Sequence, residues 1–224
     1  SQNDHTHRST DDVLAASRGA LGRFHETPDG WPISDGLGMF RHARELALGF
    51  YYMWDPRPPA KWLEARRVWA AFVRQVLKRS RTLDSELQVR NEYGETQECQ
   101  DWIAIRDTFR PNTVPVWVDT SIAQWCADWA KKHRGIVWTG HTCFGQKVAE
   151  LSGLKYYGQG GLTRDGLNIE SADTRKGFIA SIAANSTGRN LQAWQKGLIT
   201  DMPPNGMQTE QLLGRHHREG TKYD

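Results

Sequence analysis

The chain has 224 residues, of which 38% are hydrophobic and 25% are charged, and its formal net charge is +3. This length suffices for one good-sized hydrophobic core, or for one domain with an appendage, so we expect a folded globular protein. No run of about 18 apolar residues occurs and the first ten residues are polar, which argues against a membrane-spanning helix and a secretion signal. We therefore expect a soluble protein of the cytoplasm.

Net charge and cysteine content exclude only a few classes of partner and site. A net charge of +3 tolerates a polyanionic partner but does not identify one. Cys99, Cys126 and Cys143 are an odd number with no C-x-x-C spacing, which favours reduced thiols over a disulfide framework or a zinc site. The chain begins with Ser and ends after a helical-looking segment without a closing strand, so we expect both ends to be cuts in a longer polypeptide.

The first half of the chain predicts helices. Residues 1–34 are mostly polar and rich in turn formers, apart from a short amphipathic stretch over 13–24, and we expect them to be loosely ordered. Residues 37–53 lack an internal proline and predict a helix, which a proline cluster over 56–59 separates from the next. From residue 60 onward apolar side chains recur at helical spacing and predict a buried stripe rather than a base-stacking platform: Trp62, Ala65, Trp69, Phe72, Val73, Val76 and Leu77. The remaining face is basic and predicts solvent exposure rather than phosphate binding: Lys61, Arg66, Arg67, Arg74, Lys78 and Arg79.

Beyond residue 110 short apolar runs alternate with helical stretches, the pattern of a parallel α/β sheet. Strands are predicted over 114–118, 135–139, 155–157, 178–183 and 197–200. Helices are predicted after a cap at Asp119 or Thr120, over 144–152 and over 207–217. The predicted organisation is an N-terminal segment 1–34, a mostly helical extension 35–110, and an α/β domain 111–224 that is truncated at its C-terminus.

A charged motif near the end of the chain carries the chemistry. Gln211, Gly214, Arg215 and Arg218 form the pattern Q-x-x-G-R-x-x-R. On a helix the glutamine and both arginines project from one face, and two guanidiniums side by side suit a polyphosphate. The alternative is an exposed arginine pair that makes surface ion pairs with neighbouring glutamates.

This motif resembles motif VI of superfamily-two helicases, closest to the Swi/Snf-type branch and its bacteriophage relatives, although Thr221 stands where that branch continues with glutamine. Residues 183–192, A-A-N-S-T-G-R-N-L-Q, resemble motif V and follow the apolar strand 178–182. Residues 136–144, I-V-W-T-G-H-T-C-F, resemble motif IV, in which a core strand delivers a polar loop to a helix. The three motifs stand in the family's order.

The resemblance implies the C-terminal RecA-like lobe of an ATP-dependent helicase or translocase, with a parallel sheet flanked by helices. It makes Arg215 and Arg218 the catalytic arginine fingers. It assigns phosphate or nucleotide contacts to further residues: Gln211, Gly188, Asn190 and Gly214 toward ATP, and Thr139, His141, Thr142, Ser186 and Thr187 toward the nucleic-acid backbone, with Gly188 placed to contact that backbone as well. The implied setting is the cytoplasm of a bacterium or of a phage-infected host, and the implied polymer is DNA, with RNA not excluded.

A Walker A loop and a Walker B Asp-Glu pair are both missing from the sequence. The resemblance therefore implies that ATP and Mg²⁺ are held mainly by a first RecA-like lobe, and that this chain alone does not hydrolyse ATP. The competing interpretation is a non-enzymatic binding module derived from such a lobe. A metal-dependent nuclease built on His5, His7, His216 and His217 is disfavoured, because carboxylates do not cluster with these histidines.

Overall fold

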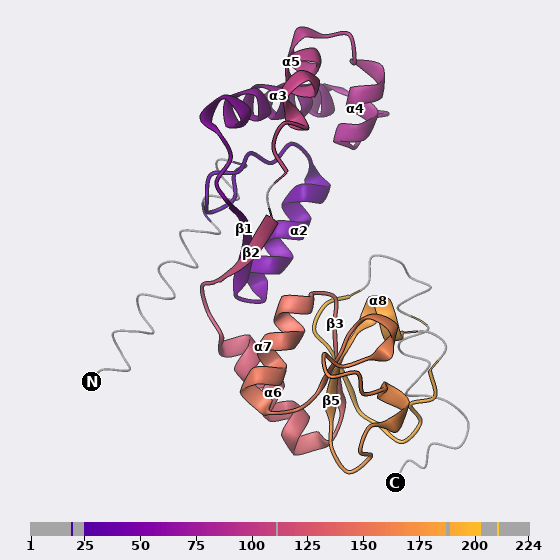
Figure 1. Ribbon diagram of the computed structural model, residues 1–224. Helices are drawn as coiled ribbons and strands as arrows, with labels where there is room; N and C mark the ends of the chain where they lie inside the picture. The colour runs from indigo at the N-terminus through magenta and orange to yellow at the C-terminus, as the bar shows by residue number, and fades with distance from the viewer. Residues whose placement is uncertain (1–18, 20–24, 111, 187–188, 203–209, 211–224) are drawn as a thin grey trace. The chain divides into compact units, whose positions relative to one another are not determined.

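The computed structural model describes residues 19, 25–110, 112–186, 189–202 and 210 of the chain. These residues form two compact units, Ser1–Asp119 and Thr120–Asp224, each with its own core (Figure 1). The boundary falls after residues 111–119, a segment that the sequence pattern groups with the second unit.

The first unit combines helices with a two-stranded ribbon. Its elements are α2 (Gly36–Ala47), β1 (Phe50–Asp55), α3 (Ala60–Arg79), α4 (Glu86–Glu92), α5 (Gln97–Arg106) and β2 (Asn112–Trp117). The strands β1 and β2 pair antiparallel from Phe50↔Trp117 to Asp55↔Asn112. The helix α2 contacts β1, and α3 packs against α4 and α5. The unit is thus mostly helical, as its sequence predicts, but the ribbon was not predicted.

The prediction of one helix over 37–53 is wrong from residue 48 onward. The helix α2 ends at Ala47, and Gly49 follows with a φ of +87°. Glycine adopts that angle without steric cost, and a side chain here would collide with the backbone carbonyl of Asp119. The aromatic run that begins at Phe50 favours a strand over a helix once the glycine has ended α2.

The segment predicted as a strand over 114–118 is indeed extended, but its expected place in the parallel sheet is wrong. It forms β2 and pairs antiparallel with β1 in the first unit, with Pro115 opposite Tyr52. Proline has no backbone N–H to donate to a second neighbour, and strands with one neighbour tolerate it. The proline is therefore the feature of the sequence that argues against a central strand.

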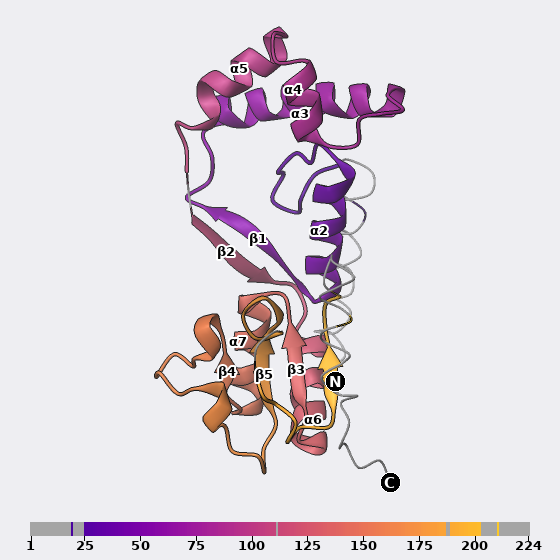
Figure 2. The same cartoon turned by 90° about the vertical axis from the view of Figure 1, so that its right-hand side faces the viewer.

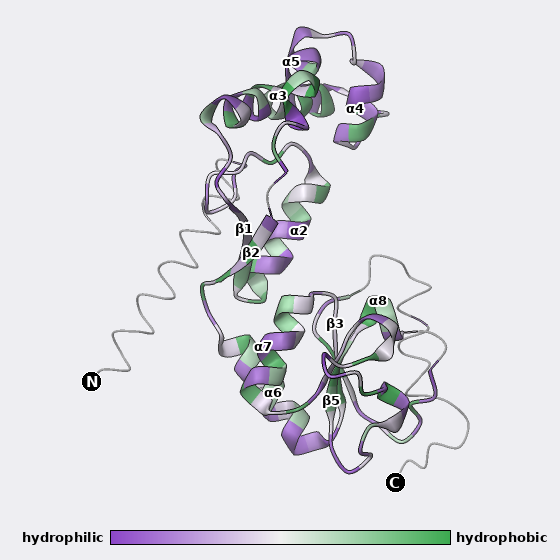
Figure 3. Cartoon of the chain, in the orientation of Figure 1, coloured by the Kyte–Doolittle hydropathy of each residue, from purple (hydrophilic) through white to green (hydrophobic). Residues whose placement is uncertain are grey.

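The apolar stripe of α3 is confirmed as core. Trp62, Trp69 and Val73 are buried in a cluster with Val89, Cys99 and Trp102, while the other members of the stripe pack partly buried against it. Alternating polar and apolar colours along α3 show the two faces (Figure 3). Arg66 was expected on the wet face, and this is wrong: it is 8% exposed and pairs with Glu86. The carboxylate of Glu86, at the start of α4, offsets the cost of burying the charge of Arg66.

The second unit is an α/β domain. Its elements are α6 (Ser121–His133), β3 (Ile136–Thr139), α7 (Thr142–Ser152), β4 (Tyr156–Tyr157), the 3₁₀ turns η1 (Gln159–Gly161) and η2 (Ile169–Ser171), β5 (Phe178–Ser181), α8 (Ile182–Asn185) and β6 (Gly197–Ile199). The four strands pair parallel in the order β4-β5-β3-β6, which Figure 2 shows side by side. Figure 1 shows α6 and α7 on one side of this sheet and α8 on the other. The predicted α/β class with a helix-flanked parallel sheet is confirmed.

The core of the second unit lies along the central strands. Ile136 and Trp138 of β3 pack with Phe178 and Ala180 of β5, and Trp194 covers them. All three cysteines are free: Cys99 and Cys126 are buried, as expected of core thiols, and Cys143 is half-buried, while burial raises the pKa of the Cys126 thiol to about 11. Among the residues that the structure describes, no helix combines the length and apolar character needed to cross a membrane.

Candidate functional site

Polar residues follow three neighbouring strands of the second unit at the same edge of the sheet. Gly140 and His141 follow β3, Ser186 lies one short helix beyond β5, and Asp201 follows β6. The register pairs Thr139 with Ser181, the last residues of β3 and β5. Because the strands are parallel, their carboxyl ends meet, and this edge is where open α/β sheets bind ligands.

The loop after β3 is organised by Thr139. This residue is fully buried, and its hydroxyl donates to the carbonyl of His141 (3.1 Å) and accepts from the His141 backbone N–H (3.2 Å). The loop then enters α7, with His141 at the N-cap and Thr142 as the first helical residue. Thr142 is exposed, so the loop presents a hydroxyl and the N-terminal end of α7 to solvent. The buried side chain of Thr139 therefore fixes the conformation of the loop, and Thr142 lies on the surface of the loop.

The end of β6 is attached to the same loop. The backbone N–H and the hydroxyl of Thr200 both donate to the carbonyl of Trp138, at 3.0 and 3.1 Å. Asp201 comes next, and its Oδ2 lies 3.6 Å from Nε2 of His141. A Cβ at Gly140 would collide with this carboxylate and displace the Asp201 side chain, so glycine permits the close approach. A carboxylate and an imidazole thus lie together at the edge.

The loop after β5 is held by Asn185. Its side chain is fully buried, and its amide nitrogen donates to the carbonyls of Tyr157 (3.0 Å), Gly158 (3.2 Å) and Ser181 (3.2 Å). Ser186 follows as the C-cap of α8, and its backbone N–H bonds to the carbonyl of Ile182 at 3.0 Å. Asn185 therefore ties the region resembling motif V to the end of β4.

Arg189 makes a second connection between the same segments. Its guanidinium donates to the carbonyl of Gly160 at 2.6 Å, and a side chain at Gly161 would collide with it. Gly161 has a φ of +73°, a second reason for glycine at this position. Asn190, the next residue, is exposed. Of the polar residues described after β5, Asn185 and Ser186 are therefore buried, Arg189 is half-buried and Asn190 is exposed.

The structure brings together part of the site that the sequence predicts. Thr139, His141 and Thr142 lie in one loop, and Ser186 and Asn190 follow the adjacent strand. The other predicted site residues lie outside the described part of the chain: Thr187, Gly188, Gln211, Gly214, Arg215 and Arg218. The predicted helix over 207–217 lies there too, except for residue 210.

Sequence reasoning missed Asp201 and Asn185. Asp201 was detectable in principle, because it follows a predicted strand and polar residues after parallel strands gather at one edge. Asn185 gave no such signal, since its role depends on carbonyls that only the fold brings near. Among the described residues, no three His, Cys, Asp or Glu side chains lie together in a way that suits a metal ion.

At this edge the exposed Thr142 hydroxyl and the N-terminal end of α7 suit the binding of phosphates, because backbone N–H groups and hydroxyls donate to phosphate oxygens. The hydroxyls of Thr139 and Ser186 belong to buried residues, and the carboxylate of Asp201 does not favour an anion. Comparisons with protein-family models, with curated proteins and with solved structures find no match to this chain.

Proposed function

We propose that this chain is the second RecA-like lobe of a superfamily-two ATP-dependent nucleic-acid helicase or translocase. In this proposal the edge of the parallel sheet contacts the nucleic-acid backbone and faces ATP. A first RecA-like lobe with Walker A and B motifs holds ATP and Mg²⁺. The polymer is DNA, with RNA as an outcome that the same assays detect.

One observation carries the proposal: the two segments that resemble motifs IV and V follow adjacent parallel strands, β3 and β5. The motif order along the chain does not require this adjacency, because β4 intervenes in sequence and lies on the far side of β5. The arrangement brings both polar loops to one edge, as a shared grip on a phosphate backbone needs. A sheet in which these strands were separated would not support the proposal.

The mechanism follows from the charges that the motifs supply. Arg215 and Arg218 face the γ-phosphate from across the cleft between lobes and stabilise the negative charge that develops during phosphoryl transfer. ATP binding draws the lobes together and hydrolysis releases them, so the loops after β3 and β5 regrip the backbone in each cycle. Since these contacts go to phosphates, they carry little sequence preference.

The test begins with the coding sequence on both sides of this segment, which is expected to encode Walker A and Walker B upstream. In the protein that carries both lobes, Arg218→Ala is expected to lower nucleic-acid-stimulated ATP turnover about a thousandfold or more, because an arginine finger contributes that much. Colorimetric phosphate release measures the rate, and circular dichroism checks the fold.

Arg175→Ala is the matched control, since Arg175 is exposed and pairs with Asp173 in a loop before β5. This variant is expected to keep the full rate. Near-normal turnover in Arg218→Ala would refute the catalytic assignment. A coding sequence without any such first lobe would favour the non-enzymatic binding module.

A further inference from the structure

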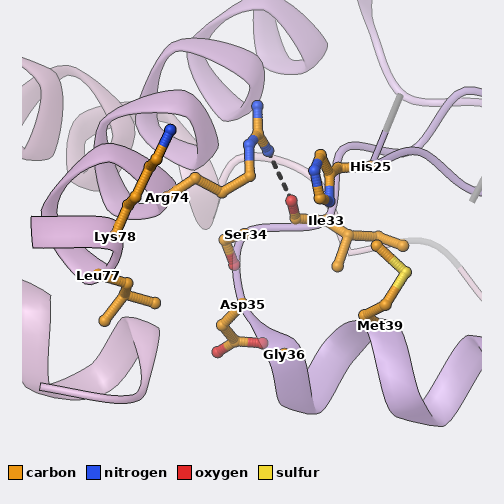
Figure 4. A pocket seen from close by; sticks show the side chains of 9 residues that line it. All are labelled: His25, Ile33, Ser34, Asp35, Gly36, Met39, Arg74, Leu77 and Lys78. Carbon is orange, nitrogen blue, oxygen red and sulfur yellow. Dashed lines mark hydrogen bonds between the residues drawn. The ribbon is translucent and has the colours of Figure 1, made fainter. Parts of the chain in front are cut away.

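A cavity of about 350 Å³ lies in the first unit, between the N-terminal end of α2 and the C-terminal half of α3 (Figure 4). This volume is at the small end of the range for ligand pockets in proteins. Its apolar lining comes from Ile33, Met39 and Leu77, which project from three different segments. No motif in the sequence points to this cavity, and the proposed function does not use it.

Cationic side chains line the same cavity. Arg74 and Lys78 are one turn apart on α3, so both lie on the face toward the cavity. Figure 4 shows His25 and Met39 across the cavity from Leu77 and Lys78. The imidazole and the thioether are groups that pack well against a planar ring. The cavity therefore pairs an apolar slot with positive charge.

Among the described residues that line the cavity, Asp35 supplies the one carboxylate, and this carboxylate already accepts hydrogen bonds. Asp35 caps α2, and its Oδ1 accepts from the Gly38 backbone N–H at 2.8 Å. Its Oδ2 accepts from the backbone N–H of Glu86 at 3.1 Å. Asp35 is thus held by the fold, and it offsets only part of the charge of the two basic side chains.

The surroundings of the Arg74 guanidinium favour the binding of an anion. One N–H of its guanidinium donates to the carbonyl of Ile33 at 2.6 Å, which fixes the side chain at the cavity and leaves further donors on the same group. Burial lowers the pKa of Arg74, and the charge of nearby Arg66 lowers it further, although Glu26 partly opposes both. Arg66 itself is neutralised by Glu86 at 2.6 Å. An anion in the cavity would relieve the remaining excess of positive charge.

We propose that this cavity binds a nucleoside monophosphate unit. The base lies in the slot formed by Ile33, Met39 and Leu77, and the phosphate lies between Arg74 and Lys78. Arginine suits this role because its fork of N–H donors matches phosphate oxygens. The unit has two possible sources, a free nucleotide or the 5′-phosphorylated end of a strand. This site is independent of the proposed ATP hydrolysis, which involves the second unit.

Isothermal titration of the 224-residue chain with deoxyadenosine monophosphate tests the proposal. Saturable binding is expected, with deoxyadenosine and inorganic phosphate each binding at least about tenfold more weakly, because each satisfies half of the site. Lys78→Glu is expected to weaken nucleotide binding about tenfold or more, since it removes one charged contact and adds repulsion. Lys61→Glu is the matched control: Lys61 is exposed on the same helix and does not line the cavity.

Three results would overturn the proposal: no binding to the native chain, equal binding by the native chain and Lys78→Glu, or equal losses in Lys78→Glu and Lys61→Glu. The last would mean that only overall charge matters. Both lysines are exposed, so neither variant should impair folding. Competition by a 5′-phosphorylated oligonucleotide, but not by its 5′-hydroxyl form, identifies a strand end as the source. Nucleotide binding without such competition identifies the free nucleotide.

Discussion

At the scale of single residues, the first unit contains a partly buried charge network, in which the side chain of Glu86 is 25% exposed. Glu86 accepts hydrogen bonds from Arg66 at 2.6 and 2.9 Å, from the indole N–H of Trp69 at 2.7 Å, and from the hydroxyl of Ser34. Arg66 also lies over the rings of Trp31 and Trp102, at 5.8 and 5.4 Å. A polar network surrounded by tryptophans is costly to break, because any partner that is removed leaves a buried group unsatisfied.

Glu86→Gln is expected to lower the free energy of unfolding by about 1–3 kcal/mol at pH 7, since a charged acceptor becomes a weaker neutral one. Burial acts to raise the pKa of Glu86, but the hydrogen bonds and charge of Arg66, together with Ser34 and Trp69, outweigh burial and lower it below the ordinary value of 4.5. The stabilisation is therefore present above pH 4.5 and is lost as the pH falls through the lowered pKa. Urea unfolding at pH 7 and at lower pH measures the effect.

The difference between the native chain and Glu86→Gln should shrink as the solution becomes acidic. Glu92→Gln is the control, because Glu92 is exposed at the other end of α4. A difference that stayed constant down to pH 3 would show that the charge of Glu86 does not stabilise the unit. Sequence alone did not reveal this network, since Arg66 and Glu86 lie on different helices and their pairing depends on the packing of α3 and α4.

At the scale of elements, α7 lies unusually close to the sheet because of Gly145. A Cβ at this position would lie 2.5 Å from the ring of Tyr156 and 2.8 Å from the side-chain methyl of Thr139. Glycine inside a helix normally costs up to about 1 kcal/mol relative to alanine. Here that cost is offset by the close packing of α7 on β3 and β4.

Gly145→Ala is accordingly expected to destabilise the second unit by about 1–3 kcal/mol, because crowding outweighs the gain in helix propensity. Gly36→Ala is the matched control in α2, where an added Cβ meets no atom within 4 Å, and it should be neutral or slightly stabilising. Thermal unfolding followed by tryptophan fluorescence compares the two. Stabilisation by both substitutions would mean that α7 does not approach the sheet as closely as described.

Elements were predictable where the periodicity was strong and the contacts were local. The helix α3 followed from its apolar stripe, and β3, β5 and β6 from short apolar runs between helices, which are typical of buried parallel strands. The strand β1 was not predicted, because its residues continue the apolar character of α2 and only Gly49 separates them. The partner of β2 was not predicted either, since β1 lies more than 50 residues earlier in the sequence and periodicity carries no information about pairing.

At the scale of the whole molecule, the candidate site is a consequence of strand order. The sequence pattern predicted that Thr139 ends one strand and that Ser186 follows another, but not that these strands are neighbours. Adjacency arises because β4 pairs on the outer side of β5, which leaves β5 beside β3. The net charge of +3 did not locate this edge, because composition carries no information about which strands are neighbours.

If binding at the loops after β3 and β5 brings two basic side chains of the chain onto phosphates, the affinity for duplex DNA should fall about tenfold between 50 and 200 mM salt, because each phosphate neutralised by a Lys or Arg contributes about −0.9 to the slope of log K against log salt. Fluorescence anisotropy with two unrelated duplexes measures both the slope and the sequence preference, which should be small.

Thr142→Asp is expected to weaken binding, since it adds a negative charge at the exposed start of α7. Gln146→Asp is the control, because Gln146 is also exposed and lies one turn further along the same helix. An affinity that did not change with salt, or equal losses in both variants, would mean that this edge of the sheet does not bind the backbone.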